Sequence, residues 1–193
     1  RLSYTTIEGD NKTLPPIFQQ QDGARILSTL TPRIVFDTRD NRILPSTGIF
    51  FEGSVEFGGG PFFGDLDWVR PNLDAARYFT MVKLKNGGRH ILELHARVSL
   101  IEAYLGTKDV PPFLRYFGGG ISDVRGFESR TISPIQNGTY IGGKKIVAAT
   151  AEYSLPLSEE IVRASAFLDT GQVWDAGHTD PGSRVVNRTG FRT

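Results

Sequence analysis

Three histidines, His90, His95 and His178, are the first candidates for metal binding or acid–base chemistry. His90 and His95 are five residues apart, so on one strand they point to opposite faces and cannot bind the same metal ion. His178 lies in a polar segment between Asp175 and Asp180, for which a solvated loop is the simpler interpretation. The chain has no cysteine, which excludes thiolate metal sites and a cysteine nucleophile.

A pair of carboxylates, Asp37 and Asp40, lies in the run DTRDN and could in principle perform acid–base catalysis. The pair falls where a strand gives way to a turn, and Asp and Asn side chains commonly cap turns at such places. The motifs GxSxG, GxxxxGK[ST] and GxGxxG are absent from the sequence. We therefore expect no enzymatic activity, no metal and no cofactor.

The segment RYFGGGISDVRGFESRTISP (115–134) combines glycines, aromatic residues and a central Val124-Arg125-Gly126-Phe127. Phe117, Val124 and Phe127 favour burial, which predicts that this loop folds back onto the protein. Inside a wide barrel, the lumen is the available place. Arg125 would then need acidic partners, because a buried guanidinium without a partner is very costly.

Two acidic residues of later segments, Glu152 and Asp169, are the candidate partners of Arg125. Both fall on the polar side of an alternating pattern, and each belongs to a different predicted strand. The alternative is that Arg125 and the two acids are each separately solvated. The residue types alone leave both interpretations open.

The elements that would position these side chains are strands. Within the segment 89–104, apolar and polar residues alternate from Leu92 to Leu100, which separates them onto two faces of a strand and would scatter them around a helix. Similar alternation recurs along the chain, more roughly in two of the segments. We predict an all-β, antiparallel, sequentially paired sheet with little helix, with strands near 25–39, 48–58, 67–83, 89–104, 143–156 and 161–175.

The alternation also predicts which way each side chain points. One face should meet lipid and carry Leu92, Leu94, Val98, Val147, Ala149, Ala151, Ala164 and Leu168. The other should line a lumen and carry Glu93, Arg97, Thr150, Glu152, Phe167 and Asp169. A register error of one residue would invert every assignment.

Composition and loop lengths narrow the class of protein. With 22 Lys and Arg against 21 Asp and Glu, the net charge of +1 argues against a nucleic-acid binder. No apolar run approaches the ~18 residues of a membrane-spanning helix. Short turns alternate with long connections, as in an up-and-down transmembrane β-barrel, and charged residues on the polar faces suit a water-filled lumen. A soluble β-sandwich or barrel, whose strands also alternate, is the alternative.

Several motifs together resemble a known family. Val124–Phe127 in a long loop, Thr150-Ala151-Glu152 on the next strand and FLDTGQVWD (167–175) after it resemble the BamA-type outer-membrane assembly factors. This bacterial surface antigen barrel family also includes TamA, the mitochondrial Sam barrel, the chloroplast Toc barrel and two-partner secretion transporters. The run DTRDNRILPSTG (37–48) resembles an upstream segment of the same family, so the likeness covers nearly the whole chain in order.

The resemblance implies a fold, a site and a function. It implies a sixteen-stranded barrel in the bacterial outer membrane, whose loop at about 105–142 enters the lumen. The Arg of the loop, here Arg125, would contact Glu152 and Asp169, while Phe167 and Gly171 of the FLDTG motif face inward. The family assembles β-barrel clients into the outer membrane, with accessory lipoproteins and periplasmic chaperones as partners and without nucleotide or metal.

Relative to the family pattern, we expect residues 1–193 to form part of one barrel domain. The periplasmic modules, the first strands and the final strands are not in this sequence, and Gly190–Thr193 reads as the beginning of another strand. Two other functions stay open: a polypeptide-secretion pore of the same family and a general porin-like barrel. The motifs do not distinguish an assembly factor from a secretion pore.

Overall fold

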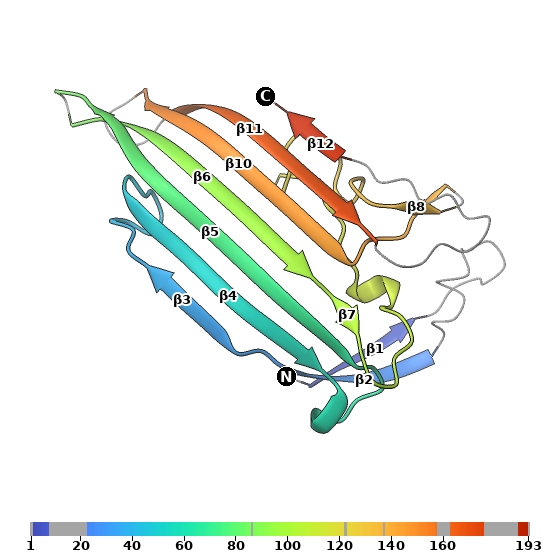
Figure 1. The fold of residues 1–193 in the computed structure, drawn as a ribbon. Helices are drawn as coiled ribbons and strands as arrows, with labels where there is room; N and C mark the ends of the chain where they lie inside the picture. The colour runs from blue at the N-terminus through green and yellow to red at the C-terminus, as the bar shows by residue number, and fades with distance from the viewer. Residues whose placement is uncertain are drawn as a thin grey trace.

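The computed structural model describes residues 2–7, 23–85, 87–121, 123–136, 138–157, 163–175 and 189–192. In these ranges ten strands form one antiparallel sheet in the order β1-β2-β4-β5-β6-β10-β11-β12, with β3 beside β4 and β7 beside β5 (Figure 1). A separate hairpin pairs β8 with β9. The strands are β1 (Leu2–Ile7), β2 (Gly23–Leu30), β3 (Arg33–Asp37), β4 (Gly48–Gly58), β5 (Trp68–Lys83), β6 (Arg89–Leu100), β7 (Glu102–Ala103), β8 (Ile135–Gln136), β9 (Thr139–Tyr140), β10 (Lys145–Pro156), β11 (Arg163–Trp174) and β12 (Thr189–Arg192).

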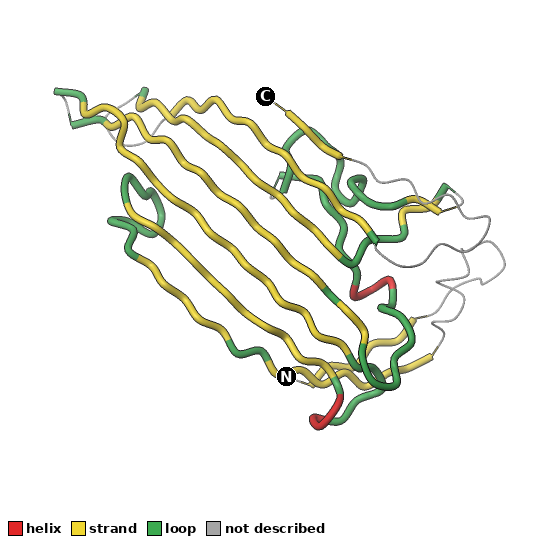
Figure 2. Tube along the Cα trace, viewed as in Figure 1, coloured by secondary structure: helices red, strands yellow, loops and turns green. Residues whose placement is uncertain are grey.

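The predicted all-β antiparallel fold is confirmed. Long strands run side by side across the molecule, and loops gather at their ends (Figure 2). β4 has the predicted bounds, and β5, β10 and β11 end within two residues of theirs. Helical structure in the described residues is limited to two 3-10 turns, η1 (Gly60–Phe62) and η2 (Pro112–Leu114). None of the helices in the described ranges has the length and hydropathy needed to cross a membrane.

The register of the sheet divides its side chains into two faces as the alternation predicts. Directly opposed residues share a face, so Glu93, Glu152 and Phe167 lie in one row. The next row, Leu94, Ala151 and Leu168, points the other way. We call the first side, against which the long loop packs, the loop face, and the second the outer face. Leu94 and Leu168 are 44% and 37% exposed, so the outer face presents apolar side chains to its surroundings.

The prediction of one strand over 25–39 is wrong, because the chain breaks between Leu30 and Arg33. Pro32 has no backbone N–H to donate, and a proline also restricts the residue before it. β2 pairs with β1 for most of its length and meets β4 only at Thr29 and Leu30, whereas β3 runs alongside β4. The proline therefore lets β2 leave the line of the sheet.

The predicted strand over 89–104 is also interrupted. β6 ends at Leu100, and the Ile101 amide then donates to the carbonyl oxygen of Lys144 at 2.8 Å. The following residues, β7, pair with Trp68 and Val69 of β5. Ile101 is fully buried, which explains the break: the chain turns to place this side chain in a core.

Two apolar cores lie where the loops meet the sheet. The first lies where β5 begins and β6 ends, and contains Leu27, Leu66, Trp68, Ile101 and Val110. The second lies between the long loop and the loop face, and contains Val124, Ile132, Ile146 and Val173. The residues between β7 and β10 thus contribute to both cores, and this connection is a packed part of the protein.

Candidate functional site

The guanidinium of Arg125 joins the long loop to two neighbouring strands. Its Nη1 donates to Glu152 Oε2 at 2.6 Å, its Nε to Asp169 Oδ2 at 2.7 Å and its Nη2 to Asp169 Oδ1 at 2.8 Å. Glu152 lies on β10 and Asp169 on β11, so one side chain spans both strands. The contacts predicted for Arg125 are therefore present.

Two further contacts complete what we call the Arg125 cluster: Arg125, Glu152, Phe167 and Asp169. The guanidinium carbon lies 3.5 Å from the centre of the Phe167 ring, in a cation–π contact, and the Arg125 amide donates to Asp169 Oδ2 at 3.0 Å. The Asp169 side chain is 1% exposed, but that of Arg125 is 28% exposed. The cluster holds two carboxylates and one cation, so its formal charge is −1.

The residues beside Arg125 shape the loop for this contact. Gly126 has a φ of +86°, a conformation that L side chains rarely adopt. Val124 is buried in the second core, and Phe127 packs against the same core. A Cβ placed on Gly171 would lie 2.6 Å from Val124 Cγ2, so only glycine lets the loop approach β11 this closely.

A second ionic cluster, which sequence reasoning missed, fastens the beginning of the long loop. The Arg115 side chain is fully buried and donates to Asp109 Oδ2 at 2.7 Å, Asp175 Oδ2 at 2.8 Å and the Val110 carbonyl at 2.8 Å. Lys144 Nζ lies 2.6 Å from Asp109 Oδ1 and 3.8 Å from Asp175 Oδ1. These four charged residues, the Arg115 cluster, hold two cations and two carboxylates and are formally neutral.

The Arg115 cluster has an electrostatic consequence at Asp109. Burial raises the pKa of the Asp109 carboxyl, but the hydrogen bond from Lys144 and the charges of Arg115 and Lys144 outweigh it, so the pKa lies below its ordinary value. One sequence signal could have indicated the cluster: Lys144 directly precedes β10 and Asp175 directly follows β11. Because Lys145 and Trp174 are paired, the two flanking residues must be neighbours.

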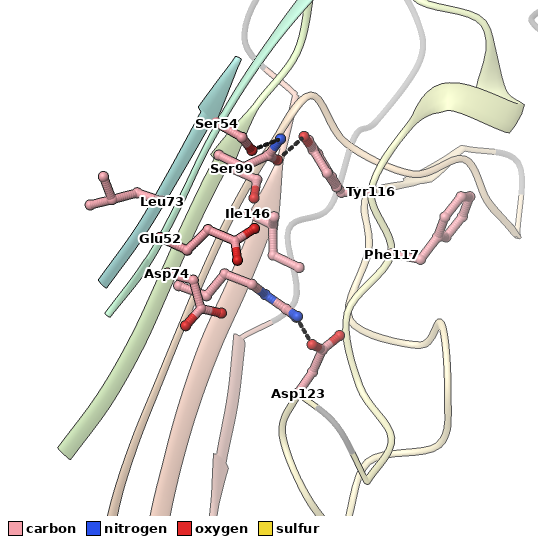
Figure 3. Close-up of a pocket in the computed structure, with 11 residues that line it drawn as sticks. Glu52, Ser54, Leu73, Asp74, Ser99, Tyr116, Phe117, Asp123 and Ile146 are labelled. Carbon is pink, nitrogen blue, oxygen red and sulfur yellow. Dashed lines mark hydrogen bonds and ion pairs between the residues drawn. The ribbon is translucent and has the colours of Figure 1, made fainter. Parts of the chain in front are cut away.

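A third ion pair and a hydroxyl connect the middle of the loop with the loop face. Arg97 on β6 pairs with Asp123, and the Tyr116 hydroxyl donates to the Leu100 carbonyl at 3.1 Å. Between loop and sheet lies a cavity of about 440 Å³, lined by these side chains and by Glu52 and Asp74 among others. Figure 3 shows Glu52 and Asp74 on the sheet side of this cavity and Asp123 on the loop side.

Two of the histidines considered for metal binding or acid–base chemistry have partners outside the Arg125 cluster. His90 Nδ1 lies 3.0 Å from the Tyr153 hydroxyl on the outer face, whereas His95 Nε2 lies 3.0 Å from Asp74 Oδ1 on the loop face. The two histidines thus diverge as predicted. In the described ranges, no group of three or more His, Cys, Asp or Glu side chains is arranged to hold a metal ion. His178 and Asp180 lie outside the described residues.

The carboxylates of the DTRDN run serve the turn, as expected from their position. Asp37 and Arg39 form a bidentate pair, with Arg39 Nε donating to Asp37 Oδ1 and Nη2 donating to Asp37 Oδ2, both at 2.9 Å. Asp40 accepts hydrogen bonds from the Ser46 hydroxyl and from the amides of Ser46 and Thr47, and this lowers the pKa of its carboxyl. These carboxylates close the connection between β3 and β4.

The geometry supports attachment of a loop to a sheet. Each ionic cluster joins the segment between β7 and β10 to β10 and β11 or to their immediate flanks. The donors and acceptors of the Arg125 cluster bond one another, so the cluster holds the long loop against β10 and β11.

Comparisons with known proteins agree with this architecture. The Omp85 superfamily domain matches residues 1–193. The chain is 32% identical over 163 residues to the outer membrane protein assembly factor BamA of Nitratidesulfovibrio vulgaris, which covers 83% of this chain and 20% of that protein. BamA of Neisseria meningitidis serogroup B is 36% identical over 101 residues, 48% of this chain and 13% of that protein. The sorting and assembly machinery component 50 homolog of Mus musculus is 24% identical over 174 residues, 80% of this chain and 33% of that protein.

A solved structure shows the same fold. The crystal structure of BamA from Haemophilus ducreyi lacking POTRA domains 1–3 matches 79% of this chain and 31% of that chain, with a TM-score of 0.70 and 19% sequence identity. The chain spans between 13% and 33% of the length of these relatives. With the family domain matched over residues 1–193, the chain belongs to the Omp85 superfamily, and its antiparallel sheet is part of an outer-membrane β-barrel.

Proposed function

We propose that the protein containing this chain assembles β-barrel proteins into the outer membrane. The relatives named as outer membrane protein assembly factors and as sorting and assembly machinery components support this proposal. In this protein, residues 105–142 would form a loop inside the barrel, and the loop face would line the lumen. The clients would be unfolded outer-membrane β-barrel proteins, with accessory lipoproteins and periplasmic chaperones as further partners.

The observation that carries the proposal is the Arg125 cluster. One guanidinium, stacked on the Phe167 ring, joins the loop to two strands. The loop inside the barrel would therefore hold a fixed position relative to β10 and β11. Arg suits this role better than Lys, because its planar fork donates to two carboxylates at once. We infer that the cluster keeps the barrel in the shape that client assembly requires.

The proposed function needs no covalent chemistry. A client strand gains backbone hydrogen bonds when it pairs with a strand edge, and its apolar side chains gain lipid contact. These two gains provide the driving force without nucleotide or metal. The role of this chain would be to supply a stable part of the barrel next to which pairing takes place.

The test uses the full-length protein reconstituted in phospholipid vesicles, with an unfolded barrel protein added as client. Arg125→Ala should reduce the amount of folded client, because it leaves the buried Asp169 carboxylate with fewer donors. Loss of one member of a buried charged set costs up to about 3–5 kcal/mol, and the partial exposure of Arg125 places it toward the lower end. Arg125→Lys should recover only part of the activity.

Arg130→Ala is the matched control, because Arg130 is exposed on the same loop and stacks on Phe117 at 3.8 Å without either acid as partner. It should assemble clients like the unmodified protein. Equal activity of Arg125→Ala and Arg130→Ala would contradict the role given to the cluster. If the unmodified protein moves the client across the membrane without inserting it, the protein is a secretion pore of the same family.

A further inference from the structure

Arg77 on β5 places a cation on the outer face of the sheet. The side chain of Arg77 on β5 belongs to the outer-face row Ile49, Arg77, Leu94, Ala151 and Leu168, in which its four cross-strand neighbours are apolar. Arg77 is exposed, and no ion pair joins it to another residue of the described ranges. An Arg on the lipid side of a barrel destabilises the barrel by about 2–4 kcal/mol at mid-membrane and by close to none at the interface. An Arg in an apolar row is therefore best placed where its guanidinium reaches a polar partner at the membrane interface.

The guanidinium is turned toward the short-turn end of the sheet. Its carbon lies 4.9 Å from the ring centre of Phe79, two residues further toward the turn that joins β5 and β6. Arg side chains on membrane proteins extend in this way to bring the charged group to the level of lipid headgroups. Short turns lie on the periplasmic side of outer-membrane barrels, so the headgroups in reach are those of the periplasmic leaflet.

An apolar groove begins beside Arg77. It has a volume of about 430 Å³ and is lined on the outer face by Ile49, Arg77, Leu94 and Leu168 and by the alanines of the neighbouring row. Ala75, Ala96 and Ala149 oppose one another on three strands, so the floor of the groove is low while larger side chains form its edges. This volume falls within the ~300–1,000 Å³ typical of small-molecule sites.

The positive charge of Arg77 beside an apolar groove favours a ligand that has both a negative group and an apolar chain. The geometry points to a binding site for one anionic glycerophospholipid of the periplasmic leaflet, with its phosphate on Arg77 and an acyl chain in the groove. A guanidinium donates to a phosphate in the same bidentate manner as to a carboxylate. A zwitterionic lipid of similar size would also fill the groove, but its own cation would offset the charge of its phosphate and weaken the match to Arg77. The inference depends on the outer-membrane location and not on the assembly function proposed above.

The test measures lipid binding to the purified full-length protein in a neutral detergent, by native mass spectrometry. The probes are dioleoylphosphatidylglycerol and dioleoylphosphatidylcholine, which share acyl chains and differ in net charge. Arg77→Gln should weaken phosphatidylglycerol binding roughly tenfold, as expected for a lost charge-assisted hydrogen bond. It should weaken phosphatidylcholine binding less, because the choline cation already offsets the charge of that phosphate. Ala96→Leu, which fills the groove, should weaken the binding of both lipids.

Arg130→Gln is the matched control, since it removes an equal charge and a similar cation–π contact from the long loop. It should bind both lipids like the unmodified protein. Equal losses in Arg77→Gln and Arg130→Gln, or none in Arg77→Gln, would overturn the site. If Arg77→Gln does not fold, Arg77→Lys and Ala96→Leu carry the test: unchanged phosphatidylglycerol binding in both would reject it. Client assembly is not part of this measurement, so its result is independent of the proposed function.

Discussion

The two ionic clusters of the long loop both attach it to the sheet, but they differ in their balance of charges. In the Arg115 cluster, two cations meet two carboxylates, and the Arg115 side chain is 0% exposed. In the Arg125 cluster, one cation serves two carboxylates and remains 28% exposed. A neutral cluster around a fully buried cation is suited to permanent structure, whereas a cluster with a net charge and a partly exposed cation can open and form again at lower cost. We infer that the loop is fixed at its beginning and adjustable at its tip.

The strongest test of this difference is Arg115→Ala. The substitution leaves the buried Asp175 and the partly exposed Asp109 with Lys144 as their only cation in the cluster, and it removes the packed side chain as well. We expect a loss of about 3–5 kcal/mol in the free energy of unfolding, measured by urea denaturation of the full-length barrel in detergent. Arg125→Ala should lose less. The reverse order would show that the tip of the loop, and not its beginning, is the more tightly held.

Within the Arg125 cluster, the two acids should be unequal. Asp169 accepts three hydrogen bonds from Arg125 and is almost completely buried, whereas Glu152 accepts one and is 22% exposed. We expect Asp169→Asn to cost about 1.5–3 kcal/mol in unfolding free energy, and Glu152→Gln less than about 1 kcal/mol. Similar losses for both variants would mean that the two strands are held equally.

The close approach of loop and strand gives a steric test. In Gly171→Ala, the new methyl group would lie 2.6 Å from Val124 Cγ2, so the loop must shift. We expect a cost of about 1–3 kcal/mol, together with faster proteolysis of the loop. Gly106→Ala is the control, because its Cβ would meet its nearest atom, Asp67 Oδ2, at an ordinary 3.7 Å. If Gly171→Ala is as stable as the control, Val124 does not hold the tip.

The sequence predicted the Arg125 cluster and missed the Arg115 cluster for a physical reason. Alternation assigns Glu152 and Asp169 to one face, and the resemblance of the Val124–Phe127 motif to the family then implies Arg125 as their partner. Arg115 and Asp109 lie in irregular chain, where no periodicity gives a direction to a side chain. Their contacts depend on how residues 105–115 fold over the strand ends, and this follows from tertiary packing alone.

The same reasoning explains which parts of the fold could be predicted. Strands in which apolar and polar residues largely alternate, such as β4 and β10, begin and end within two residues of the expected bounds, because one side is mainly apolar and the other mainly polar. The breaks at Pro32 and Ile101 were missed, because each depends on where the chain must leave the sheet. A proline in a strand was a local signal for the first break. For the second, the reason is the buried position of Ile101, which no local pattern marks.

The smallest expected effect is a pH dependence of the unfolding stability, and it comes from Asp109 in the Arg115 cluster. The pKa of Asp109 is lowered in the folded protein, so its pairing adds stability above its unfolded value of 3.8 and loses that stability as the pH falls through the folded value. As the pH is lowered through 3.8 and below, the urea midpoint should therefore fall by more in the unmodified protein than in Asp109→Asn. Arg130→Ala, which leaves Asp109 untouched, should follow the unmodified protein. Because Lys144 and Arg115 both face Asp109, Lys144→Met should reduce the pH dependence only in part, and a complete loss would assign the effect to Lys144 alone.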